Sequence, residues 1–325
     1  MNKKFKKFFL TIFAFFFFVE LTIQLSFLLG LNFVKQPILF YNPYCDQRYW
    51  SLLEKKILPD LNIDSHPLLS FKKKNIEIPD NFDNNKKFKD LKNELTFYGS
   101  SYINHKYFNA LLDQNNLSYK NYALDSYGLD QIYLSYKLTS HQNVNKTIII
   151  GFLLEDLDRS LFSKRDYSKV KYAKKNQKFI INQLPRKNYE VKRENDIYLY
   201  RFIKNFTTLL QNEFDPRHSE CEIKFKKDIF SFFINDIKEE AKKLNQKLII
   251  VSFNLKEDFV KNPSWRYNFI KKELDKNSVI HIDSLEILKK VSKSDVKQID
   301  KLFGEDLHNS EEGFKYIFEK IKTKL

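Results

Sequence analysis

Glycine is scarce in this chain, which has six among 325 residues, against an average usage of about 7%. The sequence has no P-loop and no dinucleotide-binding fingerprint, which excludes the nucleotide-binding classes that depend on those glycine-rich motifs. It also has no heptad array and no internal repeats. Because the composition has lost glycine almost everywhere, a retained glycine indicates positive φ or a close backbone approach. One lies in the N-terminal apolar segment, and five follow it: Gly30, then Gly99, Gly128, Gly151, Gly304 and Gly313.

Cysteine is equally rare, with only Cys45 and Cys221. Neither has a metal-ligating neighbour at a useful spacing, so we expect no zinc site and no other metal. In an oxidising compartment an isolated pair predicts a disulfide that ties the segment after the N-terminal apolar stretch to the main domain. The alternative is two buried free thiols.

The N-terminus begins with four lysines within seven residues and is then apolar from Phe8 to about Leu31. At about 1.5 Å per residue, this stretch can cross a hydrocarbon core of roughly 30 Å. The preceding lysines place the N-terminus in the cytoplasm. We therefore expect an uncleaved anchor, in a single-pass type II membrane protein whose large C-terminal part is periplasmic or extracellular. A cleaved signal peptide is the alternative, but no small-x-small cleavage site follows the apolar stretch 8–19.

Two polar residues interrupt the apolar stretch. Glu20 and Gln24 are four apart and therefore share one helix face. An intramembrane carboxylate indicates a functional or partner contact. The alternative is a protonated glutamate near the boundary of an imperfect anchor.

Acidic residues are outnumbered, with 41 against 56 basic ones and a formal net charge of +15. In a cytosolic protein this balance would indicate nucleic acid as a partner. Export removes nucleic acid from reach, so we expect none. A basic surface facing anionic lipid or acidic polysaccharide fits better. The charge alone selects no function.

The chain divides into three expected parts: a basic tip and anchor at 1–31, a connector at 32–90, and a domain at 91–325. Within the domain, β-prone and helix-prone segments alternate, which predicts a three-layer α/β/α sandwich with a parallel sheet. The segment 157–208 fits the alternation poorly and is expected to be an insertion. The expected strands are 94–98, 118–123, 146–152, 247–253 and 279–282; the expected helices are 104–114, 128–137, 228–244, 265–274 and 310–322.

Two blocks could carry chemistry. Ser101 follows an expected strand and Gly99, and residues just past strand ends line the ligand crevice of open α/β sheets. Near the C-terminus, Asp306 lies two residues before His308, immediately ahead of the last helix. A serine nucleophile needs a base that takes its proton, and the base needs a carboxylate that fixes its tautomer. Glu305 is the other acid candidate.

These blocks resemble the SGNH/GDSL hydrolase superfamily, in particular its bacterial membrane-anchored members. The similarity covers roughly 95–160 and 284–325. The nucleophile block, usually Gly-Asp-Ser, matches 99–101; the second, usually Asn-x-Gly-x-x-Gly-x-Gly, matches 121–128; the third, usually Gly-x-Asn-Asp, matches 153–156; and the last, Asp-x-(x)-His, matches 306–308. The resemblance implies a flavodoxin-like fold, and a catalytic set of Ser101, His308 and Asp306 or Glu305 that needs no cofactor.

The resemblance also implies an oxyanion and substrate region at Ser126, Gly128, Glu155 and Asp156, where the chain departs from the family. Ser126 stands at a glycine position. Glu155 stands where the family has an asparagine, and an ionised carboxylate can only accept hydrogen bonds. Either Glu155 belongs to a dedicated site, for example paired with Arg159 or Arg165, or it is protonated, or the enzyme is impaired.

Three weaker candidates lie elsewhere. His105 could face the same cleft but is equally an ordinary polar helix residue. Asp158 could bind substrate or form a surface ion pair, which we favour. Trp265 could stack on a sugar ring, although a half-buried aromatic under a loop is the simpler interpretation.

The family resemblance implies ester chemistry, and the anchor implies that this chemistry takes place in the cell envelope. We expect a serine esterase or O-acyltransferase that acts on O-acyl esters of a cell-envelope glycan or similar carbohydrate. The alternative is a catalytically impaired glycan-binding or envelope-assembly factor with the same fold. A third interpretation, a lipid-surface-binding protein, depends on charge alone.

Overall fold

The computed structural model describes residues 3–29, 37–52, 63–82, 94–186, 197–211, 215–218 and 221–325. The expected part boundaries at 31/32 and 90/91 lie outside these residues, as does Gly30, so the division into three parts stays a prediction. The chain folds into two compact units. One combines Met1–Ile57, Lys164–Asp166 and Asn188–Cys221, and the other combines Leu58–Ser163, Tyr167–Lys187 and Glu222–Leu325.

The larger unit is built on a five-stranded sheet in which every neighbouring pair is parallel. Its strand order is β4-β3-β5-β8-β9, the 2-1-3-4-5 order of flavodoxin-like folds. The expected α/β class and parallel sheet are confirmed. The strands are β3 (Leu95–Gly99), β4 (Tyr119–Asn121), β5 (Thr147–Leu153), β8 (Lys247–Phe253) and β9 (Ile280–Asp283).

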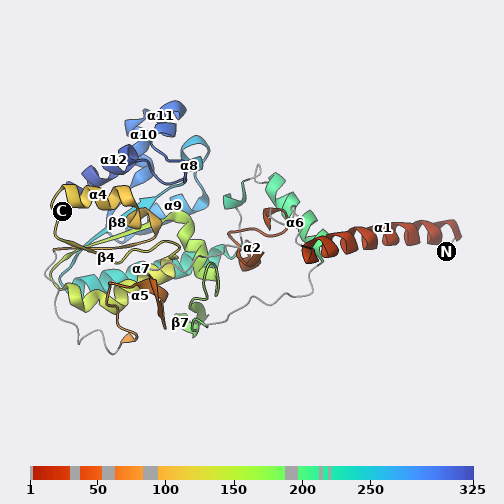
Figure 1. Ribbon diagram of the computed structural model, residues 1–325, viewed down its shortest axis with the longest axis horizontal. Helices are drawn as coiled ribbons and strands as arrows, with labels where there is room; N and C mark the ends of the chain where they lie inside the picture. The colour runs from red at the N-terminus through yellow and green to blue at the C-terminus, as the bar shows by residue number, and fades with distance from the viewer. Residues whose placement is uncertain are drawn as a thin grey trace. The chain divides into compact units, whose positions relative to one another are not determined.

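Helices cover both faces of this sheet (Figure 1). Successive strand residues point to opposite faces, so Tyr98 packs with the helices of one layer and Phe97 with those of the other. The first layer holds α5 (Leu129–Thr139), α7 (Ile223–Lys243) and α9 (Trp265–Lys276), and the second holds α4 (Lys106–Gln114), α10 (Ser284–Val291) and α12 (Glu311–Lys322). Shorter helices complete the unit: α3 (Ser101–Asn104), η4 (Ser140–Asn143), η5 (Leu154–Leu161), α8 (Glu257–Val260) and α11 (Val296–Lys301).

Two antiparallel hairpins add to the larger unit. The first joins β1 (Ile63–His66) to β2 (Ser70–Lys73) and buries Leu69 and Phe71 in the core beside α5. The second joins β6 (Lys171–Lys175) to β7 (Lys178–Gln183), within the segment expected as an insertion. The first hairpin lies in the region expected to be a connector. Strands of four residues carry too little periodicity for the sequence to reveal them.

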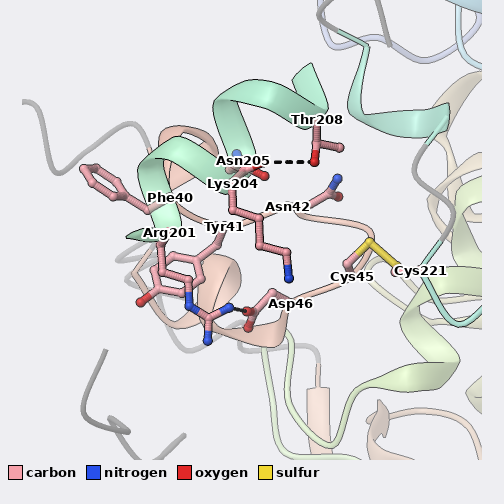
Figure 2. Close-up of a pocket in the computed structure, with 10 residues that line it drawn as sticks. All are labelled: Phe40, Tyr41, Asn42, Cys45, Asp46, Arg201, Lys204, Asn205, Thr208 and Cys221. Carbon is pink, nitrogen blue, oxygen red and sulfur yellow. Dashed lines mark hydrogen bonds and ion pairs between the residues drawn. A yellow bond between two sulfur atoms is a disulfide. The ribbon is translucent and has the colours of Figure 1, made fainter. Parts of the chain in front are cut away.

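The smaller unit contains α1 (Lys3–Leu28), η2 (Pro37–Leu39), α2 (Gln47–Leu52), α6 (Tyr198–Gln211) and η6 (Pro216–His218). Helix α1 is long and apolar enough to cross a membrane, a property that an N-terminal signal sequence shares. A disulfide joins Cys45 to Cys221. The two cysteines line a pocket of about 270 Å³, together with residues of α6 (Figure 2).

Candidate functional site

Ser101 lies at the carboxyl end of the sheet, where β3 passes into α3. Strand β3 is the point at which the strand order reverses, and ligands bind beside such switch points in open α/β sheets. The turn is tight. A Cβ atom on Gly99 would lie 2.4 Å from the Gly151 carbonyl oxygen and 2.7 Å from Ile103 Cγ1. The glycine therefore lets the end of β3 approach β5 and α3, and this approach sets the position of Ser101.

His308 lies in the loop before α12. The loop is closed by a hydrogen bond from Gly304 N–H to the His308 carbonyl oxygen (2.8 Å), and Ser310 Oγ caps α12 by accepting from Gly313 N–H (3.2 Å). The cap and the histidine coexist, as the sequence allowed. His308 Nε2 lies 2.8 Å from Ser101 Oγ. The fold thus brings together two side chains 207 residues apart.

Asp306 lies beside the other nitrogen of the His308 imidazole, Nδ1. Its backbone carbonyl oxygen lies 3.1 Å from His308 Nδ1, and its carboxylate oxygen Oδ2 lies 3.5 Å from the same nitrogen. A proton on Nδ1 can therefore be donated to Asp306, which leaves Nε2 as an acceptor for the Ser101 hydroxyl. Glu305, the alternative acid, is exposed in the same loop.

The electrostatics favour a neutral histidine beside an ionised aspartate. Burial lowers the pKa of His308 below its ordinary value, and the charge of Asp306 opposes this without reversing it. Burial raises the pKa of Asp306, but hydrogen bonds from His105 and from the His308 backbone outweigh it, so that pKa is lowered. At neutral pH, His308 can therefore accept a proton while Asp306 carries charge.

Two neighbours shape the pair in ways that the sequence did not predict. His105 Nε2 lies 3.2 Å from Asp306 Oδ2, and the His105 ring stacks on that of His308 at 5.1 Å. The Tyr102 hydroxyl donates to the Leu307 carbonyl oxygen (3.1 Å), and Leu307 has a φ of 67°. The available signal was the four-residue spacing of His105 from Ser101, which alone also fits an ordinary polar residue.

His105, Asp306 and His308 also form a group whose ligand atoms lie within 4.8 Å of one another. Two imidazoles and a carboxylate are a ligand set that zinc accepts. The same atoms serve the hydrogen bonds described above, so we assign no metal to them.

The second motif forms the turn before α5. Ser126 has a φ of 68°, the left-handed region in which glycine is most at ease. Ser126 thus adopts a backbone conformation that favours glycine, although it carries a side chain. Gly128 N–H donates to Gln131 Oε1 (3.1 Å) at the start of α5, which gives Gly128 a capping role.

Ser126→Gly is expected to raise the free energy of unfolding by about 0.5–1 kcal/mol, because it removes the steric cost of a left-handed non-glycine residue. Thermal unfolding of the full chain measures the change. Ser126→Ala is the matched control, since it keeps the Cβ atom and should give no gain. Equal stability of the glycine and alanine variants would contradict the interpretation of this turn.

The third motif follows β5. Asp156 Oδ2 accepts from Leu153 N–H (3.0 Å), and Oδ1 pairs with Arg159 Nη1 (2.9 Å). Arg159 also donates to the Tyr127 carbonyl oxygen (2.8 Å). These bonds join the end of β5 to the turn before α5. Asp156 therefore has a structural role here, and Arg159 is engaged with Asp156.

Glu155 is buried, at 6% exposure. Burial raises the pKa of Tyr102 well above its ordinary value, and the charge of Glu155 adds to this effect. Tyr102 directly follows Ser101, so the Glu155 carboxylate acts electrostatically on the segment that carries the nucleophile candidate.

The two remaining weaker candidates both contact cationic side chains of the fold. Asp158 forms an ion pair, as favoured, but the pair is buried with Arg266 and Lys226 and does not lie at the surface as expected. Trp265 is half-buried, with the Arg266 guanidinium 4.8 Å from its ring centroid.

No protein-family model matches the sequence, and no curated protein matches it. Solved structures do match. One is a member of the lipolytic protein G-D-S-L family from Veillonella parvula, with 10% identity over 71% of this chain and 98% of that chain, at a TM-score of 0.40. Another is a GDSL-like lipase from Bacteroides thetaiotaomicron, with 12% identity over 75% and 100% of the two chains, at a TM-score of 0.41. In fold the chain is thus similar to lipolytic proteins of the G-D-S-L family, which its sequence motifs resemble.

Proposed function

We propose that this chain is a serine esterase or O-acyltransferase that acts on O-acyl esters of a cell-envelope glycan or similar carbohydrate. The observation that carries the proposal is the 2.8 Å distance between Ser101 Oγ and His308 Nε2. A serine hydroxyl is a weak nucleophile unless a base within hydrogen-bond reach takes its proton. The pair satisfies that requirement, and Asp306 supplies the orienting group.

The reaction would proceed in two steps. Ser101 Oγ attacks the ester carbonyl while His308 Nε2 takes its proton, and the same proton then passes to the sugar oxygen as the ester C–O bond breaks. The acyl group is left on Ser101. Water, or the hydroxyl of an acceptor sugar, then attacks the acyl carbon and gives its proton to His308. The bond between the acyl carbon and Ser101 Oγ breaks, and His308 returns the proton to Oγ. Attack by water is hydrolysis, and attack by the sugar hydroxyl is acyl transfer.

Labelling with a fluorophosphonate probe tests the nucleophile directly. The probe should attach to the detergent-solubilised full chain at Ser101, since it reacts with activated serines. Ser101→Ala should remain unlabelled, whereas Ser100→Ala, the neighbouring buried serine, should label like the parent chain. Equal labelling of the Ser101→Ala variant would overturn the assignment.

The pH dependence of ester turnover should follow His308. Because burial lowers the pKa of His308, its neutral form, which is the active base, already predominates at the ordinary histidine pKa of about 6.5. We expect kcat/KM to rise with pH through a midpoint below about 6.5 and to be level above it. A pH profile with p-nitrophenyl acetate, corrected for spontaneous hydrolysis, measures the midpoint. A midpoint above neutrality would contradict the role of His308.

An envelope substrate requires an exported domain. Support comes from the four lysines in the first turns of α1 and from contacts that make α1 part of the smaller unit. Near the end of α1, Phe27 packs in a buried cluster with Phe40 and Tyr198. Such packing favours an anchor that is retained in the mature chain. A C-terminal reporter fusion should be active only as an exported reporter. Activity of a cytoplasmic reporter at that end would overturn the topology.

The second candidate is a glycan-binding or assembly factor with impaired catalysis, and the observation in its favour is Glu155. An oxyanion donor contributes about 10²–10³-fold to the rate, and a carboxylate at that position would repel the developing charge. Under the leading proposal Glu155 instead belongs to the built site, because a buried carboxylate persists only where its charge is compensated.

Glu155→Asn is therefore expected to lower the free energy of unfolding by about 1–3 kcal/mol, since it removes a charged group from buried interactions, without raising ester turnover. Thermal unfolding and p-nitrophenyl acetate turnover measure both effects. Glu77→Asn, at an exposed loop position, is the control and should change neither. A rise in kcat of about 10-fold or more, the low side of an oxyanion donor's contribution, would favour the impaired candidate.

A further inference from the structure

Glu20 lies in the membrane-spanning segment and binds the start of another helix. Its carboxylate oxygens accept hydrogen bonds from the backbone N–H groups of Tyr198 (2.9 Å) and Leu199 (2.7 Å), and Gln24 donates to Oε1 (2.6 Å). The first N–H groups of a helix have no partner within the helix. The carboxylate of α1 therefore caps α6.

The position of this contact along α1 sets its depth in the membrane. Thirteen residues separate Lys7 from Glu20, which is about 20 Å of helix in a hydrocarbon core of roughly 30 Å. The cap then lies about 10 Å inside the far boundary of the core. Both partners gain from the contact there, because an unsatisfied N–H group and an unpaired carboxylate are each costly in lipid. Glu20 and Gln24 are thus explained as a partner contact.

A second contact holds α6 against the end of α1. The Tyr198 ring stacks on Phe27 with centroids 4.0 Å apart, and Asn205 donates to the Ile38 carbonyl oxygen. In Figure 1 the beginning of α6 accordingly lies beside the C-terminal part of α1. These contacts therefore hold the first turn of α6 beside the C-terminal part of α1, on the side of the core away from the N-terminal lysines.

Helix α6 has three different sides. Tyr198, Asn205 and Leu209 form its buried side. Arg201, Lys204 and Thr208 line the pocket shown in Figure 2, where Arg201 pairs with Asp46 at 3.5 Å. The remaining side carries exposed apolar residues, of which three aliphatic or phenylalanine side chains form one row.

This apolar row consists of Ile203, Phe206 and Leu210, which are 50%, 39% and 47% exposed. Their spacing of three and then four residues places them on one helix face. Water is a poor environment for such a row, and the cost is about 25 cal/mol per Å² of exposed apolar surface. Helix α6 begins at the apolar helix α1, so we assign the bilayer that α1 would cross as the surface that covers this row.

We propose that α6 is an interfacial helix, with Ile203, Phe206 and Leu210 in the acyl-chain boundary of the leaflet away from the N-terminal lysines. An amphipathic helix in this position buries its apolar face about 5–10 Å into the headgroup boundary. The membrane attachment of the chain then consists of one spanning and one interfacial helix, tied together by Glu20. This inference is independent of the proposed ester chemistry and requires only that α1 crosses the bilayer.

Quenching of tryptophan fluorescence by brominated phospholipids tests the contact. The full chain carrying Phe206→Trp is reconstituted into phosphatidylcholine vesicles with and without bromine on the acyl chains, and the emission of the parent chain, which has two tryptophans, is subtracted. We expect the added emission to fall at least about twofold in brominated vesicles, as for a side chain inside the interface. Lys204→Trp, on the pocket side of the same helix, should be unaffected.

Phe16→Trp, in α1, reports separately on the spanning helix and should be quenched. Quenching of Phe16→Trp without quenching of Phe206→Trp would overturn the interfacial helix and leave the anchor intact. Blue-shifted but unquenched emission from Phe206→Trp would mean that protein covers this side, which also overturns the proposal, as would equal quenching of Lys204→Trp. If Phe206→Trp fails to fold, Ile203→Trp on the same face replaces it.

Discussion

Ser101→Ala is expected to lower kcat/KM for p-nitrophenyl acetate by about 10⁴-fold or more, which is the scale on which serine hydrolases lose activity without their nucleophile. The hydroxyl lies 2.8 Å from His308 Nε2, so the variant loses both the attacking atom and the proton that the base would take. Initial-rate kinetics on the detergent-solubilised full chain measure the loss.

His308→Ala should cost nearly as much as Ser101→Ala, and the double variant should be little worse than either, because a nucleophile and its base act as one unit. Ser100→Ala is the matched control. It changes the adjacent serine, which is buried at 1% exposure, and should keep most of the activity. Multiplication of the two single losses in the double variant would contradict a shared step.

The largest loss of stability is expected from Asp158→Ala. Asp158 receives Arg266 Nε at 2.7 Å and Nη2 at 2.6 Å, and Lys226 Nζ lies 2.5 Å from its Oδ1. All three residues are at most 1% exposed. Removal of the carboxylate takes away the ion-pair partner that two buried cations share, and breaking a buried pair costs about 3–5 kcal/mol.

The expected fall in Tm is roughly 10 °C for a chain of this size, measured by thermal unfolding in detergent. Glu286→Ala is the control, because it removes an exposed ion pair with Lys271 and such pairs contribute about 0–1 kcal/mol. Similar Tm shifts for the two variants would show that the buried cations are not held by Asp158.

Burial lowers the pKa of Lys226, the lysine of this cluster, and the charge of Asp158 opposes that effect.

The cluster joins η5 to α7 and α9, so its loss would separate the segment after β5 from two helices of one layer. The resulting displacement would reach Glu155 and Asp156, which lie in the same short helix.

The local sequence pattern was sufficient to predict the strands of the parallel sheet. The apolar run 146–152 and the strand 247–253 agree within one residue with β5 and β8, because a strand buried on both faces is continuously apolar. Strand and helix alternation then leaves few topologies open. The two hairpins and α6 were not predicted. The strands of the hairpins are too short to show a period, and α6 lies largely within the segment 157–208 that was expected to be an insertion.

Motif spacing was sufficient to name Ser101, Asp306 and His308 as candidates, and with only two cysteines no other intrachain disulfide was available. The sequence could not give the roles of His105, Asp156 and Asp158, because each depends on partners brought in by the fold. Asp158 and Arg266, for example, are 108 residues apart.

The sequence by itself therefore determined the strands of the parallel sheet, most of the helices that cover it, the apolar α1 and the identity of the candidate site residues. These features are encoded in short-range periodicity and motif. Only the tertiary structure decided which side chains meet. It placed the Glu20 carboxylate at the start of α6, put Ser126 in a left-handed conformation, and brought the Asp306 carboxylate beside two histidines. Such contacts form between segments far apart in the chain, where packing geometry and the need to satisfy buried polar groups select the partner.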